Sequence, residues 1–141
     1  MDDSPAFLPG SSDDSGSTMP TITMLTGAVL ILIGVGGYFA TGQVHLTALI
    51  PAAFGLIFVL AGAVARSWPA SRKHIMHLIV SVALLAVFGT VGGLARLVNW
   101  GLAGAAPERP AAAIAQGLTA VVCAIFIGLA VRSFILARRA R

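Results

Sequence analysis

His74 and His77 are the residues whose type and spacing come closest to a chemical site. They are three residues apart, so on a helix they would share one face. A metal site needs a third and a fourth ligand, but the remaining histidine, His45, falls near the opposite membrane face of the helices predicted below, about 30 Å away. We therefore predict no metal site. The two histidines would instead belong to a basic cluster that contacts lipid phosphate, or bind an anion or a substrate head group.

Other signatures of catalysis are missing from the sequence. No Asp or Glu falls in a predicted span, no nucleophile has a partner histidine, and no glycine-rich loop could hold a phosphate. An ion-coupled pump is expected to carry a carboxylate within the membrane. Cys123 is the only cysteine, so no intrachain disulfide can form. The sequence therefore predicts a protein that is not an enzyme and binds no cofactor.

Arg96 is the only charged residue within a predicted span. It lies two residues from the end of that span, so its side chain can extend to the outer surface at little cost. The functional alternative is an electrostatic anchor for an acidic ligand at the outer mouth of the bundle. Its predicted neighbours in such a ligand site are Gln43, Asn99 and Arg109. Glu108 could instead pair with Arg96 or Arg109.

Composition identifies the kind of element that must position these residues. The chain has 141 residues, of which 57% are hydrophobic and 10% are charged, and its mean hydropathy is +0.94. A soluble domain of this size carries about 25% charged residues. The composition therefore excludes a water-soluble globule, a nucleic-acid binder and a disordered chain, and it predicts an integral membrane protein.

Four segments are long and apolar enough to cross a bilayer, namely 21–40, 46–65, 75–98 and 111–131. A hydrocarbon core of about 30 Å needs about 20 apolar residues in a helix. The segments are apolar on every side, which favours helices over alternating β-strands. We predict an all-α membrane protein with four transmembrane helices in an up-and-down bundle. This domain would occupy residues 21–136, between a disordered acidic and serine-rich tail at 1–20 and a basic tail at 137–141.

The basic residues predict the orientation of this bundle. Most of them fall at the end that holds both termini and the middle connection, whereas Arg109 is alone in the connections at the other end. Positively charged loops stay inside, so both termini should face the cytoplasm, and the composition fits the cytoplasmic membrane of a bacterium. The predicted contacts with anionic lipid head groups are Arg72, Lys73, His74, His77, Arg138 and Arg139.

Small residues in each span predict close packing between helices. Residues four apart share a helix face, and Gly89 and Gly93 form such a pair. We expect these glycines to pack within the four-helix monomer, and a contact with a second copy or another membrane protein is the alternative. The predicted packing positions are Gly34, Gly37, Gly55, Gly62, Gly89, Gly93, Gly117 and Gly128.

The first helical hairpin resembles that of the transmembrane protein 14 family, which includes plastid fatty-acid exporters. The residues that carry the resemblance are Gly34-Val35-Gly36-Gly37-Tyr38-Phe39-Ala40-Thr41-Gly42, then Thr47-Ala48-Leu49 and Gly55. Arg96, Gly101 and Pro110-Ala111 resemble the passage of that family from helix three to helix four. The likeness covers residues 27–60 and 89–118. Ala40 departs from the family, which often has a lysine shortly after the tyrosine, and the outer connection is longer here.

This resemblance implies a membrane protein linked to the movement of lipophilic acids or related molecules. Taken with Arg96 and the packing glycines, this resemblance leads us to predict a protein that binds or transports a lipophilic anionic molecule. The alternative is a non-catalytic accessory or structural subunit of a membrane assembly. In both cases the expected partners are the bilayer, anionic head groups, and a second copy or another membrane protein, but not nucleic acid.

Overall fold

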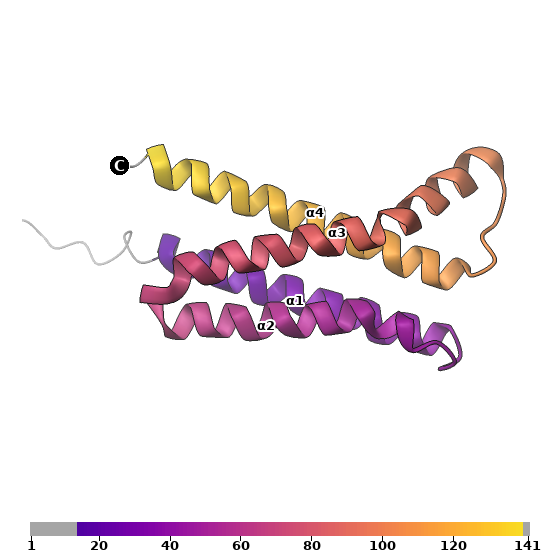
Figure 1. The fold of residues 1–141 in the computed structure, drawn as a ribbon, viewed down its shortest axis with the longest axis horizontal. Helices are drawn as coiled ribbons and strands as arrows, with labels where there is room; N and C mark the ends of the chain where they lie inside the picture. Colours follow the sequence, from indigo (N-terminus) through magenta and orange to yellow (C-terminus); the bar gives the residue numbers. More distant parts are fainter. Residues whose placement is uncertain (1–13, 140–141) are drawn as a thin grey trace, which may run out of the picture.

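The computed structural model describes residues 14–139, which form four long helices (Figure 1). These are α1 (Asp14–Ala40), α2 (Ile50–Ser67), α3 (Arg72–Ala103) and α4 (Pro110–Arg139). Short 3₁₀ turns, η1 (Leu46–Leu49) and η2 (Pro69–Ser71), precede α2 and α3. Within the described residues there is no strand. The predicted all-α, four-helix architecture is therefore confirmed.

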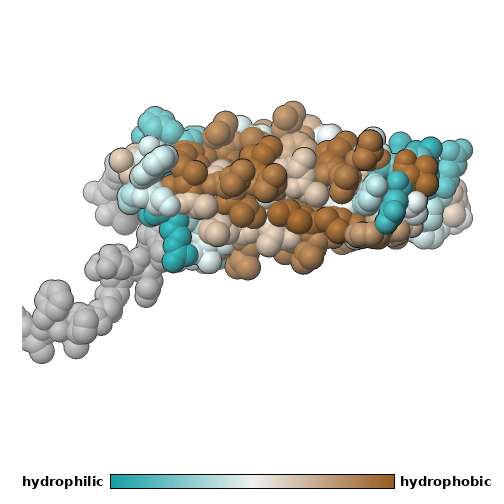
Figure 2. Space-filling view, turned by 90° about the horizontal axis from the view of Figure 1, so that it is seen from below, coloured by the Kyte–Doolittle hydropathy of each residue, from teal (hydrophilic) through white to brown (hydrophobic). Residues whose placement is uncertain are grey.

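Each of the four helical segments can span a membrane. The apolar stretches are Thr18–Ala40, Leu46–Ser67, Pro69–Ala103 and Pro110–Arg139. Large apolar side chains point outward, including Leu32, Leu85 and Phe88, which are 72%, 64% and 69% exposed. Figure 2 shows the resulting hydrophobic band, with hydrophilic groups at both ends of the bundle. Such a surface is stable in lipid but not in water, so the chain is a multi-pass membrane protein.

The two ends of the bundle differ in what they hold. The start of α1, the end of α4 and the connection from α2 to α3 lie at one end, which we call the terminal end (Figure 1). The turn from α1 to α2 (residues 41–49) and the connection from α3 to α4 (residues 104–109) lie at the other, which we call the loop end (Figure 1). Both connections at the loop end are short, so consecutive helices must be antiparallel.

The helices extend beyond the predicted spans. α1 begins at Asp14, so the disordered tail expected at 1–20 is wrong for residues 14–20, and residues 1–13 lie outside the described part. Pro20 is buried, and its carbonyl oxygen lies beside Gly62 of α2. Tertiary packing of this kind outweighs weak local helix propensity. α4 likewise continues through Arg139, where a separate basic tail was expected from residue 137; residues 140–141 are outside the described part.

Prolines and glycines set the helix ends at the loop end. The predicted span 46–65 would make Pro51 the sixth residue of the second helix. Instead, α2 starts at Ile50 after the η1 turn, so Pro51 lies in its first turn. A proline there removes no helical hydrogen bond. α3 continues to Ala103 and ends at Gly104, whose φ is 68° and whose N–H donates to the Trp100 carbonyl at 3.0 Å. α4 begins at Pro110, one residue before the predicted span 111–131.

α1 and α2 pack against each other through their backbones. A Cβ atom added to Gly27 would lie 2.6 Å from the carbonyl oxygen of Gly55, and one added to Gly55 would lie 2.5 Å from the carbonyl oxygen of Gly27. Gly34 lies against the backbone of Ala52 in the same way. Because Gly27 and Gly34 are seven residues apart, as are Gly55 and Gly62, each pair occupies one helix face. We call this contact the glycine seam.

α3 and α4 pack through side chains instead. Gly93 lies against the side chain of Gln116, and Gly117 lies against that of Leu97. The core of the bundle joins the two hairpins at Phe126 of α4 and Phe58 of α2, whose ring centroids are 5.0 Å apart in an edge-to-face arrangement. Both rings are almost fully buried. An aromatic pair of this kind adds about 0.5–1.5 kcal/mol beyond its burial.

The predicted packing glycines divide into two groups. Those that face a neighbouring helix are Gly34, Gly37, Gly55, Gly62, Gly93 and Gly117. Gly89 and Gly128 are exposed, and a Cβ atom on either would meet no described atom within 4 Å. Packing within the chain is therefore the wrong prediction for these two. The reason is rotation: Gly89 and Gly93 share a face only approximately, and α4 covers Gly93 alone.

Candidate anion-binding site

A cavity of about 490 Å³ opens at the loop end, where α3 and α4 separate. Figure 1 shows the last turns of α3 leading away from α4 before the connection returns. The cavity, which we call the outer cavity, is lined by Arg96 and Asn99 of α3, residues 105–107 of the connection, Glu108 and Arg109. Three of the four residues predicted to bind a ligand therefore line one cavity.

The length of α3 explains how a charged residue of a transmembrane helix reaches this position. α3 has 32 residues and is about 48 Å long at 1.5 Å per residue, so it exceeds a hydrocarbon core of about 30 Å. Arg96 and Asn99 lie in its last turns and share a face because they are three residues apart. Gly104 then reverses the chain in a left-handed conformation that an L side chain would strain.

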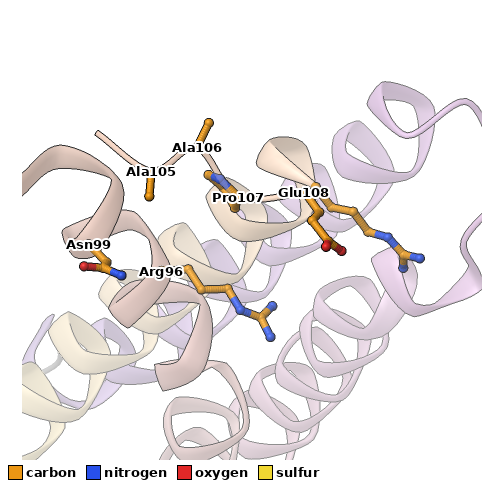
Figure 3. Close-up of a pocket in the computed structure, with 7 residues that line it drawn as sticks. Arg96, Asn99, Ala105, Ala106, Pro107 and Glu108 are labelled. Carbon is orange, nitrogen blue, oxygen red and sulfur yellow. The ribbon is translucent and has the colours of Figure 1, made fainter. Parts of the chain in front are cut away.

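The charges around the outer cavity are not paired with one another. Figure 3 shows the side chains of Arg96 and Glu108 extending toward the same side of the connection. Within the described residues, however, no guanidinium nitrogen of Arg96 or Arg109 lies within 4.0 Å of a carboxylate oxygen of Glu108. The alternative in which Glu108 forms either ion pair is therefore wrong. The side chains of Arg96 and Arg109 also make no hydrogen bond to any described group, so their donors are free to bind a ligand.

Electrostatics at this end favour an anion. Two arginines and one glutamate line the outer cavity, so their side chains sum to a net charge of +1. The first turn of α4 also points its free N–H groups toward this end, and the partial positive charge of a helix N-terminus adds to that of the arginines. Arginine binds carboxylate or phosphate through two parallel hydrogen bonds. The groups that line the outer cavity thus favour an anion over a cation.

Gln43, the fourth predicted ligand residue, lines neither cavity of the loop end. It lies in the turn after α1, where it is exposed and has a φ of 64°. Its backbone N–H donates to the Tyr38 carbonyl at 3.1 Å. The role of Gln43 in the structure is therefore to close the C-terminus of α1. This role could not be predicted, because no local pattern distinguishes a glutamine in a turn from one that binds a ligand.

A second cavity, of about 40 Å³, lies between the α1–α2 turn and the first turns of α4. We call it the inner cavity. Its polar lining consists of Thr41, His45, Thr47, Arg109 and Gln116, so Arg109 lines both cavities. Sequence reasoning missed this site because its residues come from separate hairpins. The available signal was that all of them fall within two turns of the loop end.

The predicted lipid-contact residues lie at the terminal end, and two of them have defined contacts. The Nε atom of Arg72 donates to the carbonyl oxygen of Ala65 at 3.4 Å, which satisfies part of the C-terminus of α2. The His77 ring stacks on that of Phe134, with centroids 5.3 Å apart. Its Nδ1 atom donates to the Lys73 carbonyl at 2.7 Å.

The remaining residues of this group, Lys73, His74, Arg138 and Arg139, are exposed. Among the described residues there is no cluster of three or more side chains that could hold a metal ion. The terminal end therefore presents separate basic groups to the surroundings and does not gather them into an enclosed site.

The sequence matches no protein-family model, no curated protein and no solved structure. The resemblance to the transmembrane protein 14 family stays a prediction that depends on the residues given above.

Proposed function

We propose that this membrane protein binds a lipophilic molecule with an anionic head group at its loop end. The observation that carries the proposal is the presence of Arg96, Asn99 and Arg109 around one cavity of about 490 Å³. Each hydrogen bond to a charged group contributes about 1.5–3 kcal/mol. Two arginines with free donors would thus hold a single carboxylate or phosphate, and the amide of Asn99 adds a neutral donor.

The surroundings of the outer cavity suit the apolar part of such a ligand. Val98 of α3 and Ile114 and Leu118 of α4 are exposed, on helical turns close to the residues that line the cavity. In a bilayer these side chains face acyl chains. A ligand whose head group binds Arg96 and Arg109 would therefore leave its tail in lipid. The resemblance to a family that includes fatty-acid exporters points to the same class of ligand.

The same proposal includes the placement of the protein in its membrane. Most basic residues are at the terminal end, which by the positive-inside rule would face the cytoplasm of a bacterial cell. Lys73, His74 and Arg138 would then contact anionic lipid head groups of the inner leaflet. The outer cavity would open to the opposite face, so a ligand would enter from the outer leaflet or leave into it.

An accessory role in a membrane assembly is the second candidate function. The observation that favours it is the outward position of Gly89 and Gly128, which no described neighbour covers. Crosslinking in native membranes separates the two functions. A stable partner protein in fixed ratio supports the accessory role, whereas recovery of the chain without a partner argues against it.

Native mass spectrometry of the detergent-purified protein with dodecanoate tests the proposed ligand class. We expect dodecanoate adducts on the wild-type protein, and a roughly tenfold weaker affinity for Arg96→Gln, because one charged hydrogen bond is lost. Arg66→Gln removes an exposed arginine from the terminal end and should bind as the wild type does. Dodecyltrimethylammonium, a cation of equal tail length, should form no adduct. Equal dodecanoate binding by Arg96→Gln and wild type, or none by either, would contradict the proposal.

A further inference from the structure

The inner cavity has a polar lining that the proposed function leaves without a role. Thr41, His45 and Thr47 come from the α1–α2 hairpin, Arg109 ends the α3–α4 connection, and Gln116 lies in the second turn of α4. Two segments more than 60 residues apart in the sequence thus place five polar side chains around one small space. The buried polar side chains elsewhere in the described bundle, Thr23, Thr90 and Thr119, each donate to a carbonyl oxygen of their own helix. The inner cavity differs because it gathers polar groups from two hairpins, which indicates a site for a ligand.

The lining offers hydrogen-bond donors and no carboxylate. Arg109 is a permanent cation, and the amide of Gln116 carries two N–H donors; neither side chain makes a hydrogen bond to a described group. The Thr41 hydroxyl donates to the carbonyl oxygens of Gly37 and Tyr38 at 3.0 Å each, so it is already used. Thr47 and His45 add an O–H and a ring nitrogen. Free donors in a partly buried site stabilise an acceptor, and beside a cation they favour an anion.

The volume limits the size of that anion. A single water molecule occupies about 10–15 Å³ of such space, so a cavity of about 40 Å³ has room for a halide ion or for the three heavy atoms of a carboxylate. Sulfate and phosphate, with five heavy atoms, are too large. Ala48, Pro51, Ala112 and Ala115 form apolar walls on one side of the site, and the exposed Arg109 side chain borders it on the other.

We propose that the inner cavity is a second anion site, which binds one compact monovalent anion of halide or carboxylate size through Arg109 and Gln116. The anion is either free in solution, such as chloride or formate, or is the carboxylate head of an amphiphile that passes Arg109 from the outer cavity. The site does not require Arg96, so it stands apart from ligand binding in the outer cavity.

Broadening of the ³⁵Cl NMR line by the protein in detergent micelles measures this site directly. The chain has two glutamines, Gln116 in the cavity and Gln43 outside it, which gives a matched pair. Methionine keeps the length of glutamine without its donors. We expect Gln116→Met to lose at least half of the wild-type broadening and Gln43→Met to keep it. Formate should displace chloride, and sulfate at equal ionic strength should not. Equal broadening by Gln116→Met and wild type, or displacement by sulfate as readily as by formate, would overturn the proposal.

Two further arms separate the alternatives. Dodecanoate that removes the chloride broadening identifies the head group as an occupant of the inner cavity, and dodecanoate that binds without removing it identifies free anions as the occupants. Arg96→Gln should leave unchanged the part of the chloride broadening that Gln116→Met removes, so failure of this site and failure of the proposed function are seen in different measurements. Should Gln116→Met not fold, Thr47→Val removes a donor from an exposed position and should lower the broadening; unchanged broadening in that variant overturns the proposal.

Discussion

The two hairpins of this bundle have the same topology but are held together differently. α1 and α2 contact each other through the glycine seam, where the backbones of Gly27 and Gly55 meet directly. α3 and α4 contact each other through side chains, such as that of Leu97 against Gly117, and they separate at the loop end around the outer cavity. One hairpin is closed along its length, and the other is open at one end.

This difference shows what glycine placement does in a membrane protein. Lipid gives no hydrophobic drive for helices to associate, so close van der Waals contact must hold them together. Backbone contact supplies that and leaves no room for a ligand. Contact through side chains keeps the helix axes further apart. Where α3 and α4 separate beyond these contacts, space remains for charged groups and water. The outer cavity, with the larger of the two proposed anion sites, therefore lies in the second hairpin, and the first hairpin contributes to the lining of the inner cavity alone.

Adding one methyl group to the glycine seam should give the largest effect. Gly55→Ala places a Cβ atom 2.5 Å from the carbonyl oxygen of Gly27, and because a backbone atom cannot rotate away, the helices must move apart. We expect the free energy of unfolding, measured by titration with sodium dodecyl sulfate, to fall by about 2 kcal/mol.

The matched control for that change is Gly89→Ala, on the exposed face of α3. Its Cβ atom meets no described atom within 4 Å, so the variant should be as stable as the wild type or more stable by up to about 1 kcal/mol through better helix propensity. Similar losses in both variants would show that Gly89 is also covered, and that the contrast between the hairpins does not hold in the membrane.

A methyl group in the open hairpin should have a smaller effect. Gly117→Ala places its Cβ atom 2.3 Å from Cδ1 of Leu97, which is the end of a flexible side chain. Leu97 can adopt another rotamer at a cost of about 1 kcal/mol. We expect that loss in the same unfolding titration, and we expect it to vanish when Gly117→Ala is introduced into a Leu97→Ala background. A loss that persists there would mean that the α3 backbone, and not the side chain, limits the approach.

The sequence was sufficient to predict the four helices but not their ends or rotations. Long apolar runs identify spans, because only a helix can satisfy the backbone in lipid. The ends depend on contacts distant in the sequence, such as Pro20 beside Gly62, which supports the early turns of α1. Likewise, Gly93 is covered by α4 and Gly89 is not, although the two residues are only about one helical turn apart. Hydrophobicity does not reveal it, since both faces of a lipid-exposed helix are apolar.

The candidate site could be predicted in part for a related reason. Arg96, Asn99 and Arg109 lie near the end of the third predicted span or between it and the fourth. Their positions in the sequence therefore predict that they lie at the same end of the bundle. The outer cavity itself depends on the direction of the last turns of α3, which no local pattern specifies. Gln43 falls at the same end, yet the turn directs it elsewhere. The inner cavity requires the register between the two hairpins, which becomes visible only in the folded chain.

The smallest expected effect tests the turn that closes the first hairpin. Gln43 has a φ of 64°, a conformation that costs a residue with a side chain about 1 kcal/mol, and that asparagine adopts more readily. Gln43→Asn should therefore raise the free energy of unfolding by about 0.5 kcal/mol. Gln43→Val should lower it, since a β-branched side chain is disfavoured at positive φ. The corresponding left-handed residue of the second hairpin is Gly104, which carries no such strain. Equal stability of all three residues at position 43 would mean that the turn relaxes in the membrane, and that the glycine seam alone keeps the first hairpin closed.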